Sequence, residues 1–134
     1  MPIRNLFKRK STVVVKAVKL DPGDIPEPGD FEGYMRRGWA FHSKRNQAEA
    51  EADFKKALTL NAESIEANYA LGLTKKADGQ TEAAIEYFRK AMNLIEAGKV
   101  DEGTQQEMLR RLTLGHINEL TDGDWNLEDE IWRQ

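Results

Sequence analysis

The stretch FKKAL at residues 54–58 returns 34 residues later as FRKAM at residues 88–92. The same shift superposes Ala57 on Ala91 within these strings and, outside them, two further pairs of small residues: Gly38 on Gly72 and Ala50 on Ala84. The repeated unit therefore occupies residues 31–64 and 65–98. A period of this length is typical of a helix-turn-helix unit that buries its apolar face only by stacking on a neighbour. The sequence predicts a stack of helical hairpins.

The residues that repeat have shapes suited to close helix packing. Glycine and alanine let two helices approach, and the aromatic rings of Phe54 and Phe88 fill the space between them. The second half of each unit also carries an apolar stripe at helical spacing, which includes Leu58 in the first unit and Ile85 in the second. We expect these stripes to form the core.

Four helices are expected in the repeats, at residues 31–44, 47–60, 64–77 and 81–96. Gly79 lies between the last two, where a left-handed backbone ends a helix at low cost. The first unit has no glycine at that place, and we expect Asn46 to take the role. Side-chain caps are expected from Asn61 or Ser64 for the third helix and from Thr81 for the fourth.

The Gly, Ala, Phe and Ala frame at these spacings resembles the tetratricopeptide repeat family, over 68 of the 134 residues. The resemblance implies an all-α fold of two antiparallel hairpins, in which the first helix of each hairpin lines a concave groove for a protein partner. The chain departs from the family pattern in places. The usual early aromatic residue is Tyr34 in the first unit but Asn68 in the second, and Arg37 stands where leucine is common, opposite Leu71.

The resemblance also implies which side chains face the groove. The residues predicted to contact a partner are Met35, Arg36, Trp39, His42, Glu66, Tyr69, Leu73 and Lys76. An apolar and aromatic groove suits an amphipathic helix or an extended hydrophobic segment. The family subgroup that binds acidic chaperone tails has Lys, Asn and Arg where this chain is mostly apolar, so a carboxylate clamp is not expected. Burial of Trp39 against the neighbouring helix is the alternative to a binding role.

Composition and motifs indicate a single helical domain without catalytic chemistry. The chain has 40% hydrophobic and 32% charged residues and no cysteine, so disulfides and thiolate metal sites are excluded, and we expect a cytoplasmic location. It has no phosphate-binding glycine loop, no HExxH and no Gly-x-Ser-x-Gly. The only histidines, His42 and His116, lie in different elements. We expect no enzymatic activity, cofactor or metal site.

The N-terminal residues 1–30 are predicted to form a basic extended arm that ends in a Pro/Gly linker. Residues 1–20 contain six basic and no acidic side chains, whereas the remainder contains 14 basic and 23 acidic ones. The acidic body would repel phosphates, so nucleic-acid binding is not expected. Residues 11–19 favour an extended backbone and either lie along the body, fill the groove, pair with another chain or stay mobile. Residues 1–10 form a short basic amphipathic turn that leaves weak membrane contact as an alternative.

The C-terminal part breaks the repeat but keeps helical spacing. Residues 101–120 are predicted to be a capping helix, which completes a helical domain at residues 31–120. Residues 121–134 form an acidic tail with Trp125 and Trp132, which either pack back on the body or bind a partner such as a second copy.

The sequence therefore predicts an all-α, non-enzymatic adaptor or assembly factor for a protein or peptide partner. Two alternatives remain at this point. The basic N-terminus would suit a peripheral membrane tether, and the apolar edges of a two-repeat stack would suit a self-assembling structural subunit.

Overall fold

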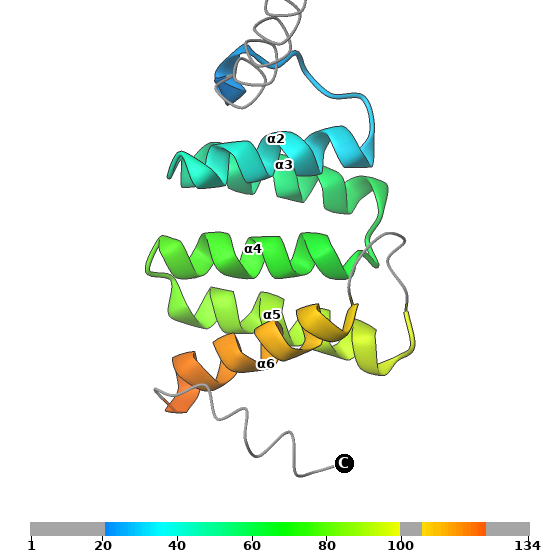
Figure 1. Ribbon diagram of the computed structural model, residues 1–134, viewed down its shortest axis with the longest axis vertical. Helices are drawn as coiled ribbons and strands as arrows, with labels where there is room; N and C mark the ends of the chain where they lie inside the picture. The colour runs from blue at the N-terminus through cyan, green and yellow to red at the C-terminus, as the bar shows by residue number, and fades with distance from the viewer. Residues whose placement is uncertain (1–20, 100–105, 123–134) are drawn as a thin grey trace, which may run out of the picture.

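The computed structural model describes residues 21–99 and 106–122. Within these ranges the chain forms a short 3-10 helix, η1 (Pro22–Asp24), and five α-helices, with no strand. The α-helices are α2 (Phe31–Ser43), α3 (Gln47–Leu60), α4 (Ile65–Ala77), α5 (Thr81–Glu96) and α6 (Gln106–Asp122). They follow one another along an elongated stack in chain order (Figure 1). The predicted all-α fold of two helix hairpins and a capping helix is confirmed.

The starts of α4 and α5 show which predicted caps are used. The Ser64 hydroxyl accepts a hydrogen bond of 3.0 Å from the backbone N–H of Ala67, so Ser64 rather than Asn61 caps α4. Thr81 is already the first helical residue of α5, and the side chain of Gln80 at the cap position makes no capping hydrogen bond. The predicted Thr81 cap is therefore wrong, because the helix begins at Thr81 itself, one residue earlier than that prediction requires.

The two turns inside the hairpins have the same backbone but different residues. Gly79 has a φ of 78° and Arg45, which lies 34 positions earlier, has a φ of 64°. Asn46 has an ordinary φ of −87°, so the prediction that Asn46 takes the left-handed position is wrong. The position within the repeat therefore decides which residue adopts the left-handed conformation. In the first unit that residue is Arg45, although this conformation costs about 1–2 kcal/mol for a residue with a Cβ.

Each hairpin is closed by the contact that the repeat predicts. Phe54 and Phe88 are fully buried. A Cβ atom added to Gly38 would lie 2.5 Å from Cε1 of Phe54, and one added to Gly72 would lie 2.5 Å from the ring of Phe88. The glycines are thus required because the ring packs directly on the backbone of the facing helix. The four paired alanines on α3 and α5 are also fully buried.

Helix α4 belongs to both repeats in its packing. Ala67, Ala70 and Leu71 of α4 lie in the hydrophobic cluster that α2 and α3 form, whereas Tyr69 lies in the cluster around Phe88 of α5. Trp39 of α2 packs against both clusters. The two repeats therefore share one continuous interior rather than two separate ones.

The first hairpin contains a buried ion pair where the second has two uncharged side chains. Arg37 donates from Nε to Oδ2 of Asp53 at 2.8 Å and from Nη2 to Oδ1 at 2.7 Å. The residues 34 positions later are Leu71 and Tyr87. The side chain of Asp53 is 5% exposed and that of Arg37 14%. The two hydrogen bonds that Arg37 donates to Asp53 raise the pKa of Arg37 above its ordinary value.

The segment before α2, predicted as a linker, packs on this end of the stack. Pro22 of η1 is fully buried. Glu27 accepts hydrogen bonds from the hydroxyl of Tyr34 at 2.9 Å and from Nη2 of Arg37 at 3.1 Å. These bonds, that of Tyr34 first, lower the pKa of the Glu27 carboxyl. Residues 21–30 thus cover the face of α2 that a preceding repeat would cover in a longer array.

At the other end, α6 packs on α5 and reaches α4, as the first helix of a third repeat would (Figure 1). Four of its apolar residues pack on the second cluster: Leu109, Leu112, Ile117 and Leu120. The helix extends to Asp122, beyond the predicted end at residue 120. Residues 101–105 of the predicted capping helix, the arm at residues 1–20 and the tail from residue 123 lie outside the described residues.

Candidate functional site

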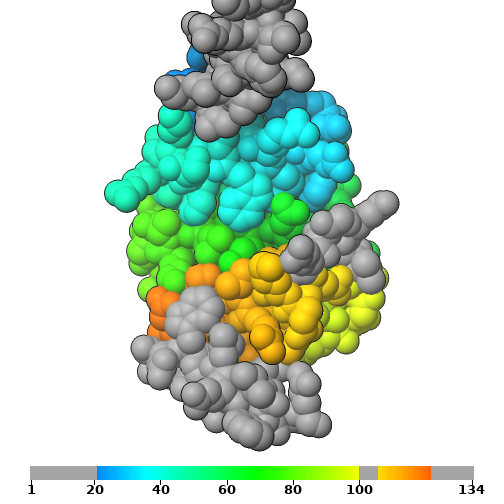
Figure 2. Space-filling model, in the orientation of Figure 1, coloured from blue at the N-terminus to red at the C-terminus, as the bar shows by residue number. Residues whose placement is uncertain are grey.

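The predicted partner-binding residues lie on α2 and α4, the first helices of the two hairpins. Figure 2 shows the side chains of α4, in green, between those of α2, in cyan, and those of α6, in orange. We call this surface the α2–α4 face. It is bordered by α6 on one side and by the two hairpin turns at one end.

Two of the predicted residues lie beneath this face. Met35 is 4% exposed and belongs to the first cluster, and Tyr69 is 7% exposed and belongs to the second. Burial raises the pKa of the Tyr69 hydroxyl. Met35 packs with residues of α4, and Tyr69 packs against Phe88 and against His116 of α6. A partner would therefore reach either side chain only after repacking. Their direct contact with a partner stays a prediction.

Trp39 lies at the junction of α2 and α4 and is held from two sides. Its indole N–H donates to Oε1 of Glu66 at 3.1 Å, across the two helices. Its ring meets Phe54 edge to face at a centroid distance of 5.1 Å and meets His42 in the same way at 5.8 Å. Trp39 is half-buried, so a part of a fixed aromatic ring remains on the surface.

The remaining accessible residues surround this ring. Arg36 is exposed one helical turn before Trp39, and Leu73 is half-buried on α4. Within the described part of the chain, Arg36 has no ion-pair partner, so its charge is available on this face. The face therefore combines an anchored aromatic ring, an aliphatic side chain and a guanidinium group.

Lys76 is held by α6 instead of facing solvent freely. Its Nζ lies 3.0 Å from Oε1 of Glu119 and 3.0 Å from Nδ1 of His116. The His116 ring stacks on Phe88 at 5.1 Å, and its Nε2 lies 3.4 Å from the hydroxyl of Tyr69. Burial first, and then the charge of Lys76, lowers the pKa of His116 to about 4. The imidazole is therefore neutral at neutral pH and belongs to the contact between α4 and α6.

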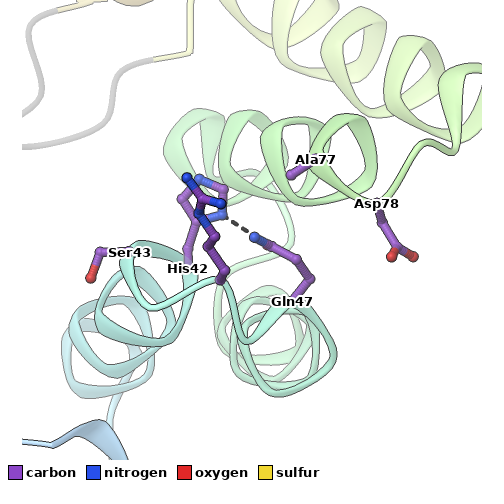
Figure 3. A pocket seen from close by; sticks show the side chains of 6 residues that line it. His42, Ser43, Gln47, Ala77 and Asp78 are labelled. Atoms are coloured by element: carbon purple, nitrogen blue, oxygen red, sulfur yellow. Dashed lines mark hydrogen bonds between the residues drawn. The ribbon is translucent and has the colours of Figure 1, made fainter.

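A hollow of about 610 Å³ opens where the two hairpin turns meet (Figure 3). It is lined by His42, Ser43, Arg45, Gln47, Ala77 and Asp78. Nδ1 of His42 is hydrogen-bonded to Oε1 of Gln47 at 2.9 Å, which fixes the imidazole at one wall. Of these residues the sequence predicted only His42, because the others meet only when the turns of successive hairpins are brought together.

In residues 21–99 and 106–122, no three side chains of His, Cys, Asp or Glu gather in a way that could hold a metal ion. None of the helices in the same ranges has the length and apolar character needed to cross a membrane.

Comparison with known proteins gives one result. The family model of the tetratricopeptide repeat matches residues 31–64 and 65–97. These are the two hairpins α2–α3 and α4–α5. Repeats of this kind generally mediate protein–protein interactions. No curated protein and no solved structure matches the chain.

Proposed function

The chain belongs to the tetratricopeptide repeat family, and from this membership we propose that it is an adaptor or assembly factor that binds a peptide or helix of a partner protein across its α2–α4 face. The proposal is supported most directly by Trp39, whose ring is fixed by Glu66 and Phe54 and is still partly exposed. Binding hot spots are enriched in tryptophan because a rigid ring loses little conformational entropy on binding.

The surroundings of Trp39 indicate what the partner segment contains. Leu73 extends the apolar surface along α4, and Arg36 places a positive charge one helical turn from Trp39 on α2. The polar hollow beside His42 lies at the end of the same face and has room for a further side chain. The best fit is a short segment with an apolar anchor for Trp39 and an acidic residue for Arg36.

The experiment starts from a displayed library of random peptides selected on the intact protein. The affinity of the selected peptides is then measured by fluorescence polarisation for the wild type and for Arg36→Glu. Reversing the charge at a contacted edge should weaken binding about tenfold, which corresponds to about 1.4 kcal/mol. Arg89→Glu, an equally exposed position on α5, is the matched control and should leave the affinity unchanged.

Two further variants separate contact from folding. Trp39→Phe keeps an aromatic ring in the core and removes the indole N–H that Glu66 accepts, so it should weaken peptide binding while circular dichroism stays that of the wild type. If peptides that bind the wild type bind Arg36→Glu and Trp39→Phe equally well, this face is not the binding surface.

The remaining predictions concern parts of the chain outside this face. Vesicle flotation with and without residues 1–10 tests the membrane tether, and mass measurement over a range of concentrations tests self-assembly.

A further inference from the structure

The two repeats differ at one aromatic position. Tyr34 in the first repeat is 9% exposed, and Nζ of Lys56 lies 5.9 Å from the centre of its ring. The residues 34 positions later are Asn68 and Lys90. The second repeat thus keeps the lysine but has a much smaller side chain in place of the ring.

A hollow of about 370 Å³ lies at this position in the second repeat. It is lined by Leu58, Ala62, Asn68, Lys90, Asn93 and Leu94. These residues come from the end of α3, the turn into α4, the first half of α4 and the second half of α5. The volume lies within the range of about 300–1,000 Å³ usual for ligand clefts. An aromatic ring bound there would lie beside Lys90, whose Nζ is 5.2 Å from the centre of the Tyr87 ring, much as the ring of Tyr34 lies beside Lys56.

The hydrogen bonding of Asn68 indicates which kind of ligand fits the hollow. Asn68 is 3% exposed, and its Nδ2 donates to the carbonyl oxygen of Ser64 at 2.8 Å. No hydrogen bond to its Oδ1 is found among the described residues. No buried side-chain nitrogen or oxygen among the described residues lacks a hydrogen-bond partner, so this oxygen is accessible from outside and can accept a hydrogen bond from a bound group. An aromatic ring that carries an N–H donor would fill the hollow and would donate a hydrogen bond to Oδ1 of Asn68.

We propose that this hollow is a binding site for an indole ring, and that its occupant is Trp132 from the C-terminal segment of the same chain. The site is separate from the α2–α4 face and does not depend on the proposed function. The segment supplies the required chemistry, since Trp132 follows Glu128, Asp129 and Glu130, whose negative charges complement Lys90 at the rim of the hollow.

The number of residues between α6 and each tryptophan favours Trp132 over Trp125 as the occupant of the hollow. The last turns of α6 lie beside the C-terminal end of α4, where Glu119 pairs with Lys76 (Figure 1). The residues that line the hollow come instead from the N-terminal half of α4 and the C-terminal half of α5. A path along the 16 residues of α5 is about 24 Å long. Trp132 comes ten residues after Asp122 and can reach about 33 Å in an extended chain. Trp125 comes three residues after Asp122 and can reach only about 10 Å.

The test uses the full chain labelled with 5-fluorotryptophan and observed by fluorine NMR, with Trp125→Phe and Trp132→Phe assigning the two tail resonances. Asn68→Tyr fills the hollow with the ring that the first repeat carries. The Trp132 resonance should then move to its position in the denatured chain, while the Trp125 resonance stays in place. A Trp132 resonance that is the same in the wild type and in Asn68→Tyr overturns the proposal.

A second measurement leaves the hollow unaltered, in case Asn68→Tyr fails to fold. Trp132 is replaced by the photo-crosslinker benzoylphenylalanine, and the crosslinked residue is identified by mass spectrometry. Crosslinks to Leu58, Lys90 or Leu94 within one chain support the site. Crosslinks elsewhere in the chain overturn it, and crosslinked dimers show that a second copy supplies the ring, which overturns the assignment to the same chain.

Discussion

Asp53→Ala should be one of the most destabilising single substitutions in this chain. The substitution leaves Arg37 in a site where its side chain is 14% exposed and where it loses two hydrogen bonds, of 2.7 and 2.8 Å. Removing one partner of a buried pair costs about 3–5 kcal/mol, because the remaining charge stays desolvated. Glu27 still accepts from Arg37 at 3.1 Å, so we expect the lower end of that range, about 3 kcal/mol.

The second repeat supplies the matched replacement. The double variant Arg37→Leu/Asp53→Tyr copies the pair Leu71 and Tyr87 into the first repeat. Replacing a buried ion pair with well-packed apolar side chains is often neutral or stabilising, so the double variant should lie within about 1 kcal/mol of the wild type. The free energy of unfolding is measured by urea denaturation followed by circular dichroism at neutral pH.

Two outcomes would refute this reasoning. One is a loss below about 1 kcal/mol for Asp53→Ala, which would mean that water reaches the Arg37 charge. The other is a double variant as unstable as Asp53→Ala, which would mean that the ion pair stabilises more than its apolar replacement. Lys55→Ala is the control, because it breaks the exposed pair with Glu51 and should cost only about 0.3–0.5 kcal/mol.

Three further predictions concern the turns, the contact of α6 and the helix crossing. Arg45→Gly should stabilise the fold by about 1 kcal/mol in urea denaturation, because glycine adopts the left-handed backbone without strain, whereas Lys44→Gly, at a φ of −89°, should destabilise it. The free energy of unfolding should fall as the pH drops from about 6.5 toward 4, because the pKa of His116 is lowered to about 4 and the unfolded chain then binds the proton more tightly. His116→Phe should weaken that pH dependence, and an unchanged slope would contradict it. Gly38→Ala should lower the free energy of unfolding by about 1–3 kcal/mol, because the added Cβ would lie 2.5 Å from the buried ring of Phe54. Gly29→Ala is the control and should not destabilise the fold, because no atom lies within 4 Å of the added Cβ. Equal melting temperatures for the two variants would count against the close contact.

The repeated residues predicted the core because each has a steric reason for its place. Phe54 needs a glycine across from it, and Gly38 stands 16 residues earlier in the sequence, on the facing helix. Such contacts within a hairpin are local, so a periodic sequence contains enough information to identify them.

Contacts between hairpins could not be predicted in the same way. Met35 and Tyr69 match the family positions that line a groove, but their burial depends on the helix that packs next to each of them. The pairing of Arg37 with Asp53 joins two deviations from the repeat that look independent in the sequence. The first hairpin turn was predicted from the preference of asparagine for the left-handed conformation, but Asn46 lies one position after the residue that adopts it, Arg45.

Because α4 packs with both hairpins, the segment that is duplicated in the sequence is shorter than the segment that can fold. Copying 34 residues reproduces α2 and α3, but the interior of that pair is closed by Ala67, Ala70 and Leu71 of the next copy. A single copy would therefore leave its hydrophobic side open to water, and the shortest fragment able to fold alone should end no earlier than Ala77. A gene that encoded one repeat alone would encode a hairpin without the helix that closes its interior. A chain with this architecture therefore needs at least three helices to fold.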